Sequence, residues 1–157
     1  MEKKIDENQL QNLLLDLLPQ WNDLLTKPFK KSLEDGMSLE MYYCIQRLKY
    51  LGGSATMSQL SEASFMPRHQ MTKLVNRLFE YNLVKRETNT ADRRFVKISL
   101  TNDAQCYLDH FIEEKGKPFR DLLQKMSDHE KQMFFESLQN IHTIFCRIDS
   151  CTHKESL

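Results

Sequence analysis

The sequence contains few of the residues that interrupt regular structure. It has only four glycines and four prolines in 157 residues, whereas 40% of its residues are hydrophobic. Because glycine and proline disfavour helix interiors, this composition predicts a helix-rich soluble protein. A chain of this length can bury one core, so we expect a single domain over residues 1–157.

Long apolar runs and cysteine pairs are also lacking. No stretch approaches the ~20 apolar residues that span a bilayer, and the opening Met-Glu-Lys-Lys does not resemble a secretory signal. The four cysteines (Cys44, Cys106, Cys146 and Cys151) form no CxxC pair. This pattern is typical of a reducing compartment, so we expect a cytoplasmic protein without a membrane partner.

The motifs of common enzymes and metal sites are missing as well. The chain has no glycine-rich phosphate loop, no nucleophile elbow and no His and acid cluster with motif spacing. Its five histidines form no HxxxH pair and no zinc-type spacing with cysteine. We therefore expect no enzymatic activity, no cofactor and no metal site within one chain. A metal site assembled across a dimer stays open.

What the chain does contain is a pair of short helices in its middle third. Thr56 and Gln59 have the spacing of a capping box, which starts the first helix. Pro67 suits the first position of the second helix, because its missing N–H would have no helical partner there. Its apolar residues recur at helical spacing and predict a buried face: Met71, Leu74, Val75 and Leu78.

A hairpin follows the second helix. Asn82 is a residue type that tolerates a left-handed cap. Residues 83–87 and 95–100 have the β-branched and aromatic content of short strands, and residues 88–94 form the polar tip between them. A faint third strand is indicated near Ala55. The fold class is therefore mainly α with a small β-wing: a winged helix-turn-helix lobe over residues 38–101, with its supporting helix capped by Ser38.

Helices with apolar stripes bracket this lobe, at residues 1–35 and 102–151. We predict a kink or break near Leu18, because Pro19 interrupts the first stripe. Ser127 and Glu130 form a second capping box that starts the final helix. One small lobe cannot bury all of these stripes, so we expect a homodimer in which the flanking helices pair between subunits.

Charge is segregated along the chain. The 22 basic and 22 acidic residues cancel, which alone argues against nucleic acid. Residues 66–101, however, contain eight basic and three acidic residues. A basic lobe on an acidic body is what a DNA-binding face requires.

These residues resemble the signature of the MarR family of bacterial transcriptional regulators. The order and spacing match through Leu60, Met71, Thr72, Leu74, Val75, Arg77, Leu78, Leu83, Val84, Arg86, Asp92-Arg93-Arg94 and Ile98-Ser99-Leu100-Thr101. Asn82 and Ala104 stand where glycine is usual, and residues 65–69 replace the commoner glycine, hydrophobe and serine run. The resemblance implies a homodimer that binds double-stranded DNA through a recognition helix in the major groove and a wing in the minor groove.

The resemblance and the residue types together predict the DNA contacts. Base edges are expected to meet Arg68, His69, Gln70 and Thr72 near the helix start at Pro67, since the first turns reach deepest into the groove. Lys73 and Arg77 suit phosphates. On the wing, Asp92 would orient Arg94 for insertion into an A·T-rich minor groove, beside Arg93. Two-fold symmetry predicts a pseudo-palindromic operator with half-sites about 10 bp apart.

The regulatory signal is harder to derive. In the family resembled, small aromatic or anionic effectors commonly bind between the dimerisation helices and the DNA-binding lobe. The residues that could border such a space are Trp21, Tyr42, Tyr43 and His110. Two alternatives stay open: a redox regulator that senses through a thiol such as Cys44, and a winged-helix module that docks protein rather than DNA. The operator, the effector and the sign of regulation are not determined by these residues.

Overall fold

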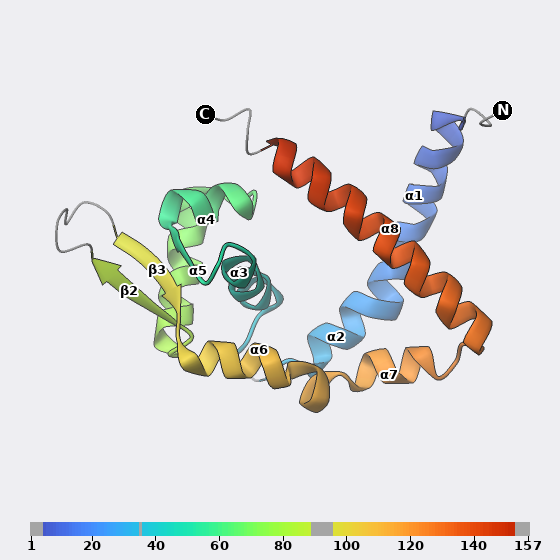
Figure 1. Cartoon of the computed structure of the whole chain (residues 1–157). Coiled ribbons are helices and arrows are strands. Elements are labelled where there is room, and N and C mark those ends of the chain that lie inside the picture. The colour runs from blue at the N-terminus through green and yellow to red at the C-terminus, as the bar shows by residue number, and fades with distance from the viewer. Residues whose placement is uncertain (1–4, 35, 89–95, 153–157) are drawn as a thin grey trace.

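A computed structural model describes residues 5–34, 36–88 and 96–152 of the chain, and shows helices around one small antiparallel sheet (Figure 1). Two parts are visible. A winged-helix lobe contains α3, α4, α5 and the sheet, and a frame of flanking helices contains α1, α2, α7 and α8. Helix α6 runs between them. The predicted fold class, mainly α with a winged helix-turn-helix, is confirmed.

The N-terminal helical region contains one irregular turn. Helix α1 (Glu7–Trp21) is followed by a π-helical turn, η1 (Asn22–Thr26), and by α2 (Lys27–Ser32). The predicted break near Leu18 is wrong by a few residues, because α1 continues through Pro19. Proline lacks one helical N–H, yet the backbone stays helical through Pro19 and widens into the π turn only from Asn22.

The supporting helix of the lobe begins at the predicted cap. In α3 (Leu39–Tyr50), the N-cap Ser38 accepts a hydrogen bond from the Met41 N–H at 3.2 Å. The helix stops at Gly52 and Gly53, whose φ angles of 85° and 90° suit residues without a side chain. Strand β1 (Ser54–Thr56) comes directly afterwards, so the faint strand near Ala55 is confirmed.

The helix-turn-helix consists of α4 (Met57–Ala63) and α5 (Arg68–Glu80). The capping box of Thr56 and Gln59 is present in both directions, at 2.9 and 3.2 Å. Pro67 is the N-cap of α5 rather than its first residue, and its carbonyl accepts the N–H groups of Gln70 and Met71, both at 3.0 Å. Asn82 follows α5 with a φ of 56°, as its predicted left-handed role requires.

The sheet has the strand order β1-β3-β2. Strands β2 (Val84–Thr88) and β3 (Val96–Leu100) form the wing, with Val84 opposite Leu100. On the other edge of β3, Ile98 lies opposite Ala55 of β1. The wing tip with Asp92, Arg93 and Arg94 lies outside the described residues, so its predicted contacts stay predictions.

The hydrophobic core lies mainly in the winged-helix lobe. Its largest side chains without exposed surface come from α3, α4, α5 and the sheet: Met41, Ile45, Leu48, Leu60, Met71, Val75, Leu78, Val84 and Ile98. Ala104 and Leu108 of α6 join the same cluster. Burial of several full aliphatic side chains stabilises the lobe by roughly 1.5–3 kcal/mol each. The packing of its buried face against α3 thus positions the recognition helix, α5.

An aromatic cluster lies where the helices that flank the lobe meet it. Helix α6 (Asn102–Lys115) is capped by Thr101, and α7 (Lys117–Leu123) starts after Gly116. Phe29 of α2 lies 4.9 Å from Tyr42 and 5.3 Å from Phe111 between ring centroids. Because these rings come from α2, α3 and α6, they join the N-terminal helices to the lobe.

The long final helix, α8 (Asp128–Thr152), begins at the predicted capping box. Ser127 Oγ accepts the Glu130 N–H at 3.2 Å, and the Glu130 carboxylate accepts the Ser127 N–H at 2.7 Å.

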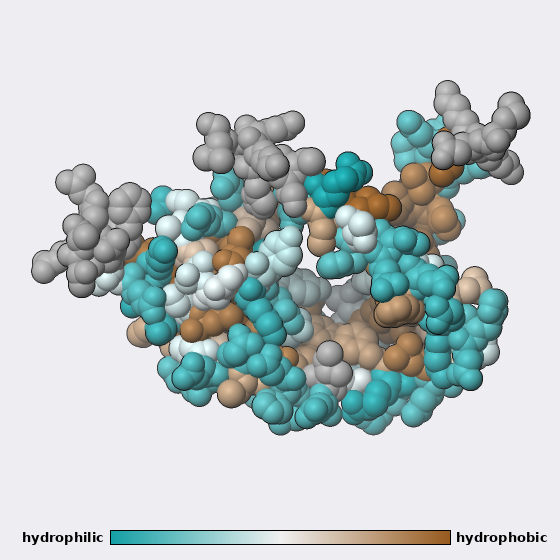
Figure 2. All heavy atoms as spheres, viewed as in Figure 1, coloured by the Kyte–Doolittle hydropathy of each residue, from teal (hydrophilic) through white to brown (hydrophobic). Residues whose placement is uncertain are grey.

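Both α1 and α8 carry exposed apolar side chains. On α1 these include Leu10, Leu13, Leu14, Leu17 and Leu18, and on α8 they include Met133, Ile141, Ile144 and Ile148. Figure 2 shows hydrophobic residues gathered over α1. Among the described residues, none of the helices combines the length and apolar content that crossing a bilayer requires. These faces are uncovered in a single chain.

Candidate nucleic-acid interface

Helix α5 has one buried face and one polar face. At about 100° per residue, its buried Met71, Leu74, Val75 and Leu78 define the side that packs on α3. The opposite side carries a stripe of exposed side chains spaced by four, three and four residues: His69, Lys73, Asn76 and Glu80. Because the apolar face packs against the core, this stripe points away from the core.

The start of α5 carries exposed polar side chains. Pro67, Arg68, His69, Gln70, Thr72 and Lys73 are all exposed. Within the described part of the chain, the side chains of Arg68, His69, Gln70 and Lys73 make no hydrogen bond or ion pair. Thr72 is different, because its hydroxyl donates to the Arg68 carbonyl at 2.9 Å. The first two turns thus present donors and a positive charge to solvent.

Arg77 is positioned differently from its predicted companions. Its guanidinium donates to the backbone carbonyl of Gly36 at 3.1 Å, which ties the end of α5 to the loop before α3. Of the basic side chains predicted on this helix, Arg77 therefore has an intramolecular partner, whereas Arg68 and Lys73 have none among the described residues.

Two residues of this surface, one on α5 and one on β2, were not predicted as site residues. Asn76 lies in the middle of the exposed stripe, and Arg86 of β2 donates a hydrogen bond to its Oδ1. The Arg86 guanidinium also lies 5.7 Å from the ring centroid of Phe79. The i+3 step from Lys73 to Asn76 could have placed Asn76 on the stripe, but the partner from β2 depends on the fold.

The acidic side chain of Glu87, on strand β2 of the wing, is paired within the wing. Glu87 accepts from Lys85 at 2.7 Å and from Ser99 Oγ at 3.0 Å. These hydrogen bonds, first from Lys85 and then from Ser99, hold the pKa of Glu87 below its usual value. Asp103 accepts from the Asn82 amide at 2.7 Å. Glu87 and Asp103 are therefore engaged by hydrogen-bond donors, whereas Glu80 remains on the exposed stripe of α5.

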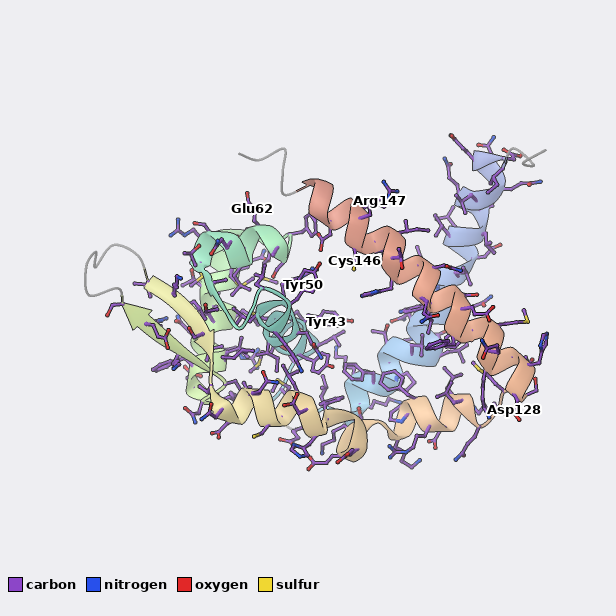
Figure 3. All side chains as sticks on the ribbon, in the orientation of Figure 1. Tyr43, Tyr50, Glu62, Asp128, Cys146 and Arg147 are labelled. Atoms are coloured by element: carbon purple, nitrogen blue, oxygen red, sulfur yellow. The ribbon has the colours of Figure 1, made fainter. Side chains whose placement is uncertain are left out.

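An open groove lies behind the helix-turn-helix. It has a volume of about 970 Å³ and is bordered by α3, by the turn of residues 64–66 and by the second half of α8. Arg47 of α3 and Asp149 of α8 form an ion pair across it, with 2.8 Å between Nη1 and Oδ2. Figure 3 shows Tyr43 and Tyr50 on the same side of α8 as Cys146, whereas Arg147 points away.

The four residues predicted to border an effector space are not brought together. Tyr43 lines the groove. Tyr42 packs instead in the aromatic cluster with Phe29 and Phe111. Trp21 is exposed on α1, and His110 is exposed on α6, where its Nδ1 lies 2.9 Å from the Cys106 carbonyl oxygen. Only the fold could reveal that α8 rather than α1 closes the groove beside Tyr43.

The cysteines differ in environment. Cys44 is buried, its Sγ lies 3.9 Å from the Met71 sulfur, and burial raises the pKa of its thiol to about 12. Cys146 lines the groove with its Sγ 3.5 Å from His142 Nε2. This pair was not predicted from the sequence, although the i, i+4 spacing of His142 and Cys146 on a helix would have indicated it. No group of three metal-ligating side chains occurs within residues 5–34, 36–88 and 96–152.

Sequence comparison finds bacterial transcriptional regulators, although no protein-family model matches the chain. The uncharacterized HTH-type transcriptional regulator YsmB of Bacillus subtilis is 28% identical over 89 residues, or 57% of this chain and 61% of that protein. The organic hydroperoxide resistance transcriptional regulator of the same species is 26% identical over 116 residues, or 74% of this chain and 79% of that protein. The chain thus spans less than two thirds of YsmB.

Solved structures agree over most of the chain. A MarR family protein from Bacillus stearothermophilus has a TM-score of 0.70 at 20% identity, covering 90% of this chain and 99% of that protein. An organohalide-sensing transcriptional regulator with bound 2,4-dichlorophenol has a TM-score of 0.62 at 18% identity, covering 91% and 87%. The resemblance found in the sequence is confirmed: the chain has the MarR winged-helix fold, and its sequence relatives are transcriptional regulators rather than enzymes.

Proposed function

We propose that this protein is a cytoplasmic, homodimeric, sequence-specific DNA-binding regulator, acting as a repressor that a small aromatic or anionic molecule releases. The observation that carries the proposal is the start of α5. Arg68, His69, Gln70 and Lys73 are exposed there without intramolecular partners among the described residues, on a helix whose opposite face is buried in the lobe. Such a helix fits the major groove.

The proposed contacts follow from side-chain chemistry. Arg68 has the paired donors that match guanine O6 and N7, and Gln70 has the donor and acceptor that match adenine N6 and N7. Each good bidentate contact discriminates between bases by roughly 1–3 kcal/mol. Lys73 supplies a point charge for a phosphate, which positions the protein without reading sequence. Arg94 and Asp92 on the wing keep their proposed minor-groove role.

Dimerisation is proposed through the helices of residues 1–35 and 102–151. The exposed apolar faces of α1 and α8 support it, because a second copy would cover them with the same surfaces. A two-fold axis would set two copies of α5 at a constant separation. The operator would then be a pseudo-palindrome with half-sites about one helical turn apart.

The groove offers a place for the releasing molecule. Its wall contains Ser64, Phe65 and Met66, which immediately precede Pro67 at the start of α5. An occupant that moved this turn would move the recognition helix. Tyr43 and Tyr50 supply aromatic contacts, and Arg47 supplies a positive charge that is at present paired with Asp149. The structural neighbour with bound dichlorophenol supports an aromatic ligand for this fold.

The test is a gel-shift titration of the full chain on its own upstream DNA across a salt series. Affinity should fall steeply as salt rises, because phosphate contacts release counterions. Arg94→Ala should weaken binding severalfold or more at matched salt, and retained affinity would refute the wing contact. If no specific binding occurs at low salt, selection from random DNA decides between an operator elsewhere and the alternative function.

The alternative is a winged-helix module that docks another protein. It predicts no specific sequence from the random-DNA selection and little dependence of partner affinity on Arg68 or Lys73. Thiol sensing on the same DNA-binding scaffold is the second alternative. The burial and raised thiol pKa of Cys44 argue against that cysteine as the sensor.

A further inference from the structure

The amide of Asn76 is held in one orientation by Arg86. A guanidinium can only donate hydrogen bonds, and here Arg86 Nη2 donates to Asn76. The amide atom that faces Arg86 must therefore be the carbonyl oxygen, Oδ1. This assignment follows from the chemistry of the pair, because the reverse orientation would place two donors against each other.

The other end of the amide points away from Arg86. Asn76 is exposed, and its Nδ2 has no hydrogen-bond acceptor among the described residues. It lies between Lys73 and Glu80 on the stripe opposite the buried face of α5. The stripe that would enter the groove thus carries, at its centre, an amide that presents its N–H donors while one lone pair of its oxygen is already engaged by Arg86.

The Arg86 side chain is itself restrained. Its Cζ lies 5.7 Å from the ring centroid of Phe79, one helical turn along α5 from Asn76. Its backbone is in β2, where it lies opposite Ile98 of β3. A cation over a ring face and a paired strand both limit where the guanidinium can go. The orientation of the amide therefore depends on contact between the wing and the recognition helix.

We propose that Asn76 reads one base of the operator as a hydrogen-bond donor, with Arg86 as the positioning residue. The proposal rests on the proposed DNA-binding function and names a specificity determinant within it. An asparagine that is free to rotate favours adenine, because its acceptor takes N6–H and its donor meets N7. Arg86 takes one of the two lone pairs of Oδ1, whereas both N–H donors of Nδ2 are left without a partner among the described residues, so acceptor edges are preferred.

The chemistry of the major groove then ranks the bases. Guanine offers O6 and N7 and thymine offers O4, whereas cytosine offers a donor at N4. We expect guanine or thymine at the position that Asn76 reads, cytosine to bind worst, and adenine to lose its bidentate advantage. The discrimination against cytosine should be about tenfold or more, as for one base contact.

The experiment is selection from random DNA with the full chain, followed by affinities for all four bases at each selected position. The position read by Asn76 is identified as the one whose preference disappears, to within about twofold, in Asn76→Ala. Arg86→Met removes the donors of Arg86 while keeping an unbranched side chain beside Phe79. In this variant the same position should gain adenine by severalfold, and preferences elsewhere should not change.

Two further variants control the interpretation. Arg86→Lys keeps a donor for Oδ1 and should retain the preference for guanine or thymine. Asn76→Asp removes the N–H donors and should lower the affinity for guanine or thymine at that position. Thermal unfolding of every variant identifies any that fail to fold, and only folded variants are compared.

The possible failures are distinguishable. If the parent protein selects no DNA sequence, the proposed function fails together with its consequences. If the parent selects a sequence but Asn76→Ala leaves all base preferences unchanged, the base-reading role of Asn76 is wrong. If Arg86→Met weakens binding equally for all four bases, Arg86 contacts phosphate and does not position the amide, which overturns its proposed role.

Discussion

Arg77 Nη2 donates to the backbone carbonyl of Gly36 at 3.1 Å, across 41 positions of sequence. The same glycine packs against Tyr81, because a Cβ added at Gly36 would lie 1.6 Å from the Tyr81 hydroxyl. The end of the recognition helix is therefore anchored to the loop before α3 by one hydrogen bond and one close contact. This anchor separates Arg77 from Lys73, which has no such partner among the described residues.

The first prediction compares these two basic residues in DNA binding. Lys73→Ala should reduce the slope of log affinity against log salt by about one per subunit, because one phosphate contact is lost. Arg77→Ala should change this slope less, since the Arg77 guanidinium is partly engaged by Gly36. Equilibrium binding between about 50 and 200 mM salt measures both slopes. Equal changes in the two variants would show that Arg77 leaves Gly36 for a phosphate.

The second prediction concerns the stability of the anchor. Gly36 has a φ of 87°, and Gly52 has a φ of 85° with no atom near an added Cβ. Gly52→Ala should therefore cost only the conformational penalty, about 1–2 kcal/mol in free energy of unfolding. Gly36→Ala should cost more, because the Tyr81 ring must move as well. Urea denaturation checks the difference, and identical losses would mean that the Tyr81 contact contributes nothing.

The third prediction concerns thiol reactivity. Only the thiolate reacts rapidly, and burial raises the pKa of Cys44 to about 12. Cys44 should therefore resist alkylation near pH 8, whereas the exposed Cys106 should be modified readily. Mass spectrometry of peptides after a timed iodoacetamide reaction measures each site. Modification of Cys44 at the rate of Cys106 in the folded protein would contradict the buried environment.

The raised pKa of Cys44 also predicts the direction in which stability changes with pH. The folded state favours the neutral thiol, so its contribution is complete below the ordinary thiol value of 9.0 and is lost as pH rises towards 12. The loss of stability between pH 9 and 11 should therefore be smaller in Cys44→Ala, once each variant is compared with itself at pH 7.

The fourth prediction tests assembly. Leu14 on α1 and Ile144 on α8 are about half exposed, at 53% and 48%. Leu14→Asp or Ile144→Asp should shift the protein from dimer to monomer, because a charge would be buried without a partner in the interface. Thr143→Asp, at an exposed polar position of α8, is the matched control. Light scattering with size exclusion reports the mass, and a parent that is monomeric at micromolar concentration would refute the dimer.

Local signals in the sequence predicted the lobe well. Ser38, the Thr56 and Gln59 capping box and Asn82 have the predicted structural roles, and the face of Met71, Leu74, Val75 and Leu78 is buried. These features depend on contacts between residues that are close in sequence. A cap or an apolar period can be recognised without knowing the rest of the fold.

One error is local, and the others lie where distant segments meet. The irregularity expected near Leu18 lies instead at residues 22–26, because α1 continues through Pro19. Tyr42 joined the aromatic cluster, while Tyr43 faced the groove beside α8. One residue of difference on a helix turns a side chain by about 100°, and only the neighbouring helices decide which face is covered.

The sequence by itself determined the order of the elements, the start of the recognition helix and the segregation of basic residues into residues 66–101, because propensity, capping and charge are local properties. Tertiary structure alone decided which of those basic residues remain available. In the folded chain, Arg77 donates to the Gly36 carbonyl and Arg86 donates to the Asn76 side chain, whereas Lys73 stays exposed. A side chain's partner depends on segments brought together by burial of the core, and that information is not contained in any short stretch of the chain.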